Sequence, residues 1–147
     1  MSDLLAEHAD FMFNAVQENV SSIAKEELSW KPIEESNSIH GILNHTVRIA
    51  YILIPQVIEG TVNPDGWDDD YEKTLHPYDE LVEDLGEARV KVVVGIREMV
   101  TEDLEGTIKL WGRDLVRKEL LFHLLREVVH HSGQIAMLKG MYRRSNA

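Results

Sequence analysis

The chain has 147 residues, with 26 acidic and 15 basic side chains that give a formal net charge of -11. This charge repels phosphate backbones and anionic membrane surfaces, so neither nucleic acid nor a membrane is an expected partner. There is no cysteine, which excludes disulfides, thiolate metal ligands and a cysteine nucleophile. Histidine and carboxylate side chains are left to bind a metal or to transfer protons.

The length is that of one domain, residues 1–147, which is enough to bury a continuous core. No apolar run approaches the ~20 residues of a membrane span. The first residues, Met1, Ser2 and Asp3, contain no basic stretch leading into an apolar one. A cytoplasmic protein is therefore expected.

Apolar residues recur at helical spacing through the first 60 residues. They predict a first helix over about residues 4–28, which ends before Pro32. The polar residues 36–38 supply N-cap side chains for a second helix over about residues 39–59. Pro55 is expected to kink its last turn.

The second half of the chain has two connections and two further helices. Residues 60–77 are rich in turn-forming and charged residues and predict a long crossover loop. A third helix is predicted over about 78–100, then a connection over 101–112. Asp114 is the expected cap of a fourth helix that reaches about residue 142. The sequence predicts an all-α four-helix bundle in which the second and third helices run parallel.

Three polar residues interrupt the apolar stripes of these helices. Glu127 and His131 lie within about 60° of Leu124 on the last helix, so they are predicted to point into the core. His45 shares the apolar face of the second helix with Ile42. An ionised carboxylate on an apolar stripe is costly unless it is paired or bound to a metal.

A pair of side chains at positions i and i+4, completed by a third from a facing helix, can close a metal site. His45, Glu127 and His131 are therefore predicted to bind a single divalent metal ion. Two imidazoles and one carboxylate suit Zn²⁺, Ni²⁺, Fe²⁺ or Mn²⁺, and they leave positions open for water or substrate. The alternative is a hydrogen-bonded Glu127/His131 couple without a metal.

Other polar residues compete for these roles. His123, four residues before Glu127, is an alternative ligand or a donor to it. His130 forms a Glu-x-x-His motif with Glu127, as in di-iron bundles. A di-iron site is not expected, because no second such motif occurs in the first three helices. Asn19 lies on the first helix at the expected level of His45, where it is a candidate to support a ligand.

Two stretches resemble the DinB-like family. Residues 28–32 (Leu-Ser-Trp-Lys-Pro), 37–39 and 43–45 (Leu-Asn-His) resemble the start of that family's second helix, including its metal-binding histidine. Residues 130–135 (His-His-Ser-Gly-Gln-Ile) resemble the family's C-terminal His-Arg-Gly-Gln-Ile signature. The metal-binding histidine of that signature corresponds to His131.

The sequence departs from the family pattern at two positions. Glu127 stands where the family has a further histidine, and it adds a negative charge that favours a harder metal than zinc. Ser132 replaces the family's arginine, so a role for that arginine in anchoring an anionic substrate does not carry over.

The resemblance implies an up-down-down-up four-helix bundle. It also implies a metal-dependent enzyme, because several relatives are transferases or isomerases that use low-molecular-weight thiols such as bacillithiol or mycothiol. The expectation is an S-transferase, or a related hydrolase or isomerase, that acts on a small molecule and forms a homodimer. The alternative is a non-catalytic metal-binding or structural bundle that dimerises.

Overall fold

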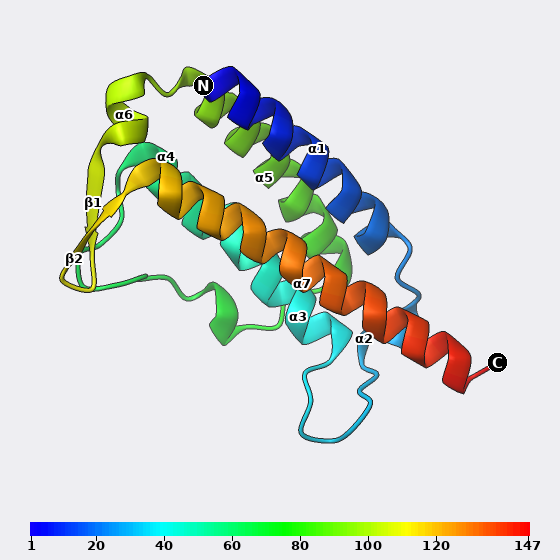
Figure 1. Cartoon of the computed structure of the whole chain (residues 1–147). Coiled ribbons are helices and arrows are strands. Elements are labelled where there is room, and N and C mark those ends of the chain that lie inside the picture. The colour runs from blue at the N-terminus through cyan, green and yellow to red at the C-terminus, as the bar shows by residue number, and fades with distance from the viewer.

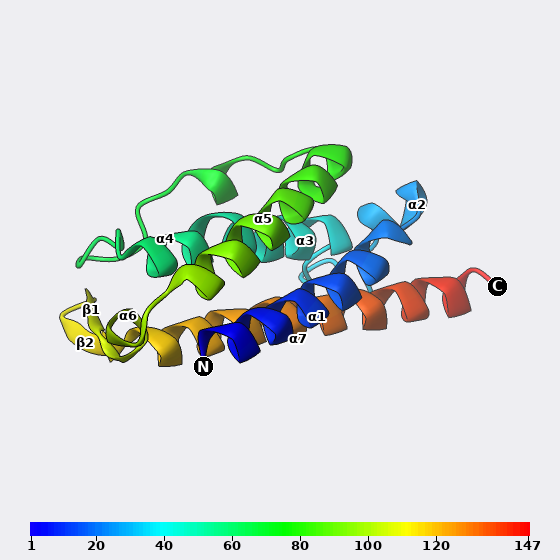
Figure 2. The same cartoon turned by 90° about the horizontal axis from the view of Figure 1, so that it is seen from above.

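The computed structural model describes all residues from Met1 to Ala147. Its body is a bundle of four long helical rods, with a small hairpin at one end (Figures 1 and 2). The rods are α1 (Ser2–Ser21), a composite rod over residues 39–59, α5 (Tyr78–Glu98) and α7 (Arg117–Ser145). The predicted four-helix bundle is confirmed.

The directions of the rods follow from their contacts. The start of α5 meets the end of α1, where Tyr78 donates a hydrogen bond to the Val20 carbonyl. The composite rod and α5 run parallel, since Tyr51 contacts Glu87 near their middles and residue 58 contacts Gly95 near their ends. The first and last rods also run parallel (Figure 2). The order is up-down-down-up, as predicted.

The composite rod has an irregular middle. Ser38 caps its start, with Oγ accepting a hydrogen bond of 3.0 Å from the Gly41 amide. A π-helical turn ends at Leu53, two residues before Pro55, at which the sequence predicts a kink. Gly60 ends the rod in the left-handed conformation at φ 73°. The three segments are α3 (Ile39–Arg48), the π-helix η1 (Ile49–Leu53) and α4 (Ile54–Glu59).

The first predicted helix is wrong in its second part, because α1 ends at Ser21 and a separate short helix, α2 (Lys25–Leu28), follows. The buried carboxylate of Glu27 explains the break. It accepts hydrogen bonds from the Ala24 amide at 2.8 Å and from Arg143 Nε at 2.7 Å. These bonds cap α2 and fix it against the end of α7.

The predicted connection over residues 101–112 contains regular structure. Its elements are α6 (Thr101–Glu105) and an antiparallel hairpin of β1 (Thr107–Leu110) and β2 (Arg113–Val116). Trp111 and Gly112 form the two-residue turn, both with positive φ, as a tight hairpin requires. Asp114 lies in β2, so its prediction as a helix cap is wrong. The last helix begins at Arg117 instead.

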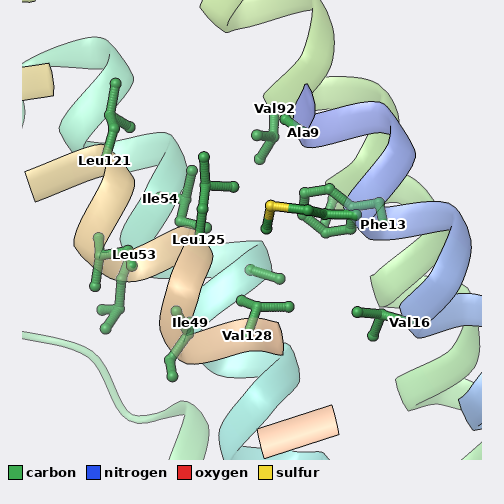
Figure 3. Packing of buried hydrophobic residues seen from close by; sticks show 14 of the residues in the cluster. Ala9, Phe13, Val16, Ile49, Leu53, Ile54, Val92, Leu121, Leu125 and Val128 are labelled. Atoms are coloured by element: carbon green, nitrogen blue, oxygen red, sulfur yellow. The ribbon is translucent and has the colours of Figure 1, made fainter. Parts of the chain in front are cut away.

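Apolar side chains from all four rods meet in one core. Figure 3 shows Phe13 of α1 and Val92 of α5 opposite Ile54 of α4 and Leu125 of α7.

The rod Ile39–Glu59 is long and apolar enough to cross a membrane by length and composition alone. However, 56% of its most apolar window is buried inside the bundle. Packing in the core accounts for this hydrophobicity.

The crossover loop, residues 60–77, includes the 3₁₀ turn η2 (Tyr71–Lys73) and is attached at both ends. Near its start, the Trp111 amide donates to the Pro64 carbonyl at 2.7 Å. Near its end, the Asn44 side chain donates to the Thr74 carbonyl and accepts from the His76 amide. The loop therefore lies in a defined position against α3.

Candidate functional site

The structure brings His45 of α3 and His131 of α7 together. Their ring centroids are 4.8 Å apart, and the planes meet edge to face at 80°. Both rings border a groove of about 420 Å³ between α3, α7 and the crossover loop. The groove is lined by Asn37, Gly41, Ile42, Asn44, His45, Glu72, Leu75, His131 and Gln134.

Glu127 lies one turn before His131, with its Oε2 3.8 Å from His131 Nε2. The prediction that these side chains point into the core is wrong, since Glu127 is 29% exposed and His131 17% exposed. Leu124 and Val128 occupy the core side of α7 and turn both polar residues toward the flank. Glu127 is also 3.3 Å from Arg126.

Glu72 is the site residue that the sequence did not reveal. Its Oε1 contacts Nδ1 of His45, and each of the two side chains is 41% exposed. His45 is therefore also more open to solvent than its place on an apolar stripe predicts. Glu72 belongs to the crossover loop, where no periodicity exists to indicate which face a residue occupies.

An ion pair next to Glu72 joins the loop to α3. Arg48 Nε and Nη2 donate to the two carboxylate oxygens of Asp69 at 3.0 and 2.9 Å, and Arg48 Nη1 lies 3.5 Å from Glu72. The hydrogen bonds with Asp69 raise the pKa of Arg48. Burial alone raises the pKa of Asp69, but Arg48 outweighs it and the pKa of that carboxyl is lowered.

The hydrogen bonds of the two histidines indicate which nitrogens carry protons. His131 Nδ1 is 2.8 Å from the amide oxygen of Gln134, which can only accept. Likewise, His45 Nδ1 faces the carboxylate of Glu72. We assign the proton to Nδ1 in both rings from these partners, which leaves both Nε2 atoms with a free lone pair.

The other histidines of α7 lie outside the groove. His123 is exposed, and its Nδ1 is 2.9 Å from Arg126 Nη2. His130 is also exposed, with its ring centroid 5.3 Å from that of His131. Neither ring lines the groove that His45 borders.

Asn19 supports the backbone beside His131. Its side-chain amide donates to the Ser132 carbonyl at 2.8 Å and to Ser132 Oγ at 3.0 Å. Ser132 is buried between α1 and α7. The small side chain at this position thus serves helix packing and does not reach the groove.

The side chains at this site fit a divalent metal ion, because the imidazoles of His45 and His131 line the groove and the carboxylate of Glu127 lies beside it, 3.8 Å from His131. No three of the chain's His, Asp or Glu side chains converge as a ready ligand set. Two ligand atoms at about 2.1 Å from one tetrahedral or octahedral ion are roughly 3 to 3.4 Å apart. The 3.8 Å between Glu127 and His131 is within reach of a small side-chain rotation.

Comparison with known proteins identifies relatives along most of the chain. Residues 8–135 match the family model described as the DinB superfamily. An uncharacterised protein of Bacillus subtilis, YjoA, is 25% identical over 125 residues, which are 83% of this chain and 78% of YjoA.

Two solved structures of DinB-like proteins share the fold. That of Bacillus subtilis YjoA has a TM-score of 0.72 at 20% identity and covers 94% of this chain and 91% of its own. A Bacillus cereus protein has the same TM-score at 16% identity and covers 95% and 90%. At these identities, the likeness establishes the fold alone.

Proposed function

The chain belongs to the DinB superfamily, and from that premise we propose that it binds one divalent metal ion in the groove between α3 and α7. His45, Glu127 and His131 are the proposed ligands. The observation that carries the proposal is the approach of the two imidazoles to 4.8 Å across the helix interface, with Nδ1 of each ring already engaged. The Nε2 atom of each ring keeps a lone pair that can bind the metal.

We propose that the site serves a metal-dependent transferase that joins a low-molecular-weight thiol to a small electrophile, or a related hydrolase or isomerase. A bound metal would lower the pKa of a thiol or water to near neutrality. In the transfer, the thiolate sulfur forms a bond to an electrophilic carbon, and the leaving group departs with the electron pair of the broken bond. The thiol proton passes to solvent.

The groove supports this proposal by its size and its walls. A volume of about 420 Å³ falls in the range of small-molecule sites. Leu75 and Ile42 provide apolar contact, whereas Asn37 and Gln134 offer hydrogen bonds to orient a polar substrate. The proposed location is the cytoplasm.

The carboxylate of Glu127 bears on which metal is bound. Zn²⁺, Ni²⁺, Fe²⁺ and Mn²⁺ all accept two imidazoles and a carboxylate. Replacement of a neutral imidazole by a carboxylate increases the preference for the harder Mn²⁺ and Fe²⁺ ions. We therefore expect Glu127→His to shift the preference toward Zn²⁺.

Metal analysis tests the proposed site. Protein purified without a histidine tag should hold about one metal ion per chain, whereas His131→Ala should hold none, measured by plasma mass spectrometry after loading and desalting. His123→Ala is the matched control, because it removes an exposed histidine of the same helix. Equal metal content in wild type and His131→Ala would contradict the proposed metal site.

Catalysis requires a separate assay. Loaded wild-type protein should consume a small thiol in the presence of an electrophile, and a chelator should stop the reaction. Metal binding without thiol consumption, across several thiols and electrophiles, would favour a metal-binding protein without turnover.

A second candidate function, that of a dimerising bundle, is favoured by an exposed apolar face on α1 and α7. Leu4 and Phe11 of α1 and Phe122 and Val129 of α7 are exposed. A groove of about 640 Å³ separates the two helices, with His8 on one wall. Isolated monomers rarely leave such a patch uncovered.

We propose a second copy of the chain as the occupant of this face, because its charges are self-complementary. Glu119 and Arg126 bracket Phe122 on α7. When two copies of α7 pair antiparallel about a twofold axis near Phe122, Glu119 of each copy faces Arg126 of the other. The α1 and α7 helices are about 30 and 43 Å long, enough for a standard interface.

Light scattering after size-exclusion chromatography tests the dimer. Wild type should elute as a dimer and Phe122→Glu as a monomer, while Val90→Glu, at an exposed position of α5, should stay dimeric. Glu119→Arg should weaken the dimer, and the exchange Glu119→Arg with Arg126→Glu should restore it. A wild-type monomer at micromolar concentration would contradict the assembly.

A further inference from the structure

We infer that Glu72 is a positioning residue for His45, so that the crossover loop forms part of the site. The inference rests on the proposed function, in which His45 binds the metal. The carboxylate of Glu72 accepts a hydrogen bond from the Nδ1–H of His45 and directs Nε2 toward the metal. Glu72 thus acts through the histidine and is not itself a proposed ligand.

The contact between Glu72 and His45 supplies the first argument. Glu72 Oε1 contacts Nδ1, the nitrogen that a ligand bound through Nε2 uses to hydrogen-bond its support. His45 is 41% exposed, so packing alone does not fix its ring. Without a hydrogen bond, both the ring rotation and the choice of protonated nitrogen would be free.

Glu72 is itself held in place by contacts of Arg48, which is the second argument. Arg48 lies one turn after His45 on the same face of α3 and reaches both Glu72, at 3.5 Å, and Asp69. The Arg48/Asp69 pair is almost buried, with side chains 16% and 10% exposed. A bidentate pair of this kind holds the loop at a fixed height along α3.

Asn44 supplies the third argument, because it anchors the chain just after Glu72. Its side chain, buried on α3 directly before His45, bonds the Thr74 carbonyl and the His76 amide. The segment that carries Glu72 is thus attached on both sides to residues adjacent to His45. An acidic residue on an unattached loop would have no reason to stay at this ring.

The histidine tautomer in the metal-free full-length chain is the decisive measurement. Above about pH 8, where imidazoles are neutral, long-range proton–nitrogen correlation spectra distinguish protonation at Nδ1 from Nε2. Wild-type His45 should carry the proton on Nδ1. Glu72→Ala should shift it to Nε2, whereas Glu72→Gln keeps an acceptor oxygen and should retain Nδ1. Asp68→Ala, at an exposed position of the same loop, is the control.

Metal affinity supplies the second readout. Competition with a chelator for Mn²⁺ and Zn²⁺ should show affinity about 10- to 100-fold weaker in Glu72→Ala, with Glu72→Gln in between and Asp68→Ala unchanged. The stoichiometry should stay at one ion per chain in all variants, because Glu72 is not a ligand.

The outcomes separate this inference from the proposed function. A wild-type His45 protonated at Nε2 overturns the inference and leaves the metal site standing. A Glu72→Ala variant that keeps the wild-type tautomer of His45 and the wild-type metal affinity also overturns the inference and leaves the metal site standing. If wild type binds no metal, the proposed function fails, yet the tautomer still decides whether Glu72 sets the proton on His45.

Discussion

Arg48 and Asp69 form the most enclosed ion pair next to the site, and their contribution depends on both partners being present. Each is largely removed from water, and the guanidinium engages both carboxylate oxygens. Loss of Asp69 leaves the guanidinium of Arg48 largely buried, with only the more exposed carboxylate of Glu72 at 3.5 Å to balance its charge. The loop segment that carries Glu72 therefore depends on this pair.

Asp69→Asn should lower the free energy of unfolding by about 2 to 4 kcal/mol at neutral pH, because it leaves the largely buried Arg48 with only the more exposed and more distant carboxylate of Glu72. Urea denaturation followed by circular dichroism measures the difference. Asp68→Asn, an exposed neighbour, should stay within about 0.5 kcal/mol of wild type.

The destabilisation caused by Asp69→Asn should be smaller at low pH than at neutral pH. The pKa of Asp69 is lower in the folded state than its ordinary value of 3.8, so the folded chain favours the ionised form. The stability contributed by Asp69 is complete above that ordinary value and is lost as the pH falls through the folded pKa. A constant difference between wild type and Asp69→Asn down to about pH 2 would contradict this assignment.

At the scale of elements, Arg117 joins the start of α7 to the end of α4. Its guanidinium donates to the Val57 and Ile58 carbonyls and pairs with Asp103 at 3.1 Å. The last carbonyls of a helix have no partner within the helix, so this side chain satisfies the C-terminus of α4. One residue thus fixes three elements at the hairpin end of the bundle.

Arg117→Met should reduce the free energy of unfolding by about 1 to 3 kcal/mol, because the carbonyls and Asp103 lose their donor. Metal affinity should not change, since 14 residues of helix, about 21 Å, separate Arg117 from His131. Arg144→Met, an exposed change near the end of the same helix, is the control in the urea titration. A large loss of metal affinity in Arg117→Met would show that the two ends of α7 are coupled.

The helices were predictable to the extent that apolar periodicity defines them. The rods over 39–59 and 78–98 follow their stripes closely. The hairpin over 107–116 escaped prediction because two strands of four residues are too short for alternation to stand out. The break after Ser21 depends on Glu27 and Arg143, which are 116 residues apart, and no local pattern encodes such a contact.

The candidate site was also predictable only in part. His45 and His131 sit on helices, so their spacing predicted which elements would present them. Their depth was not predictable, because a stripe defines a direction on one helix and not how closely the neighbouring helix covers it. Glu72 lies in a loop whose position is set by Arg48 and Asn44, and loop positions of this kind have no sequence period.

At the scale of the whole molecule, metal binding should act as a stabiliser of the fold, because the proposed ligands come from α3 and α7 and separate on unfolding. Free metal at 100 times Kd adds about 2.7 kcal/mol. For a domain of this size, that corresponds to a rise in Tm of roughly 5 to 10 °C. Differential scanning fluorimetry with Mn²⁺ or Zn²⁺ measures the rise, and His131→Ala should show none.

The parallel placement of the first and last helices has a consequence for the order of events during synthesis. Asn19 of α1 bonds Ser132 of α7 across 113 residues of chain, and His45 meets His131 across 86 residues. On a translating ribosome, the N-terminal helices emerge long before α7 exists. The groove therefore assembles only when the last helix leaves the exit tunnel, and a nascent chain that stalls before residue 131 lacks the histidine that faces His45 across the groove.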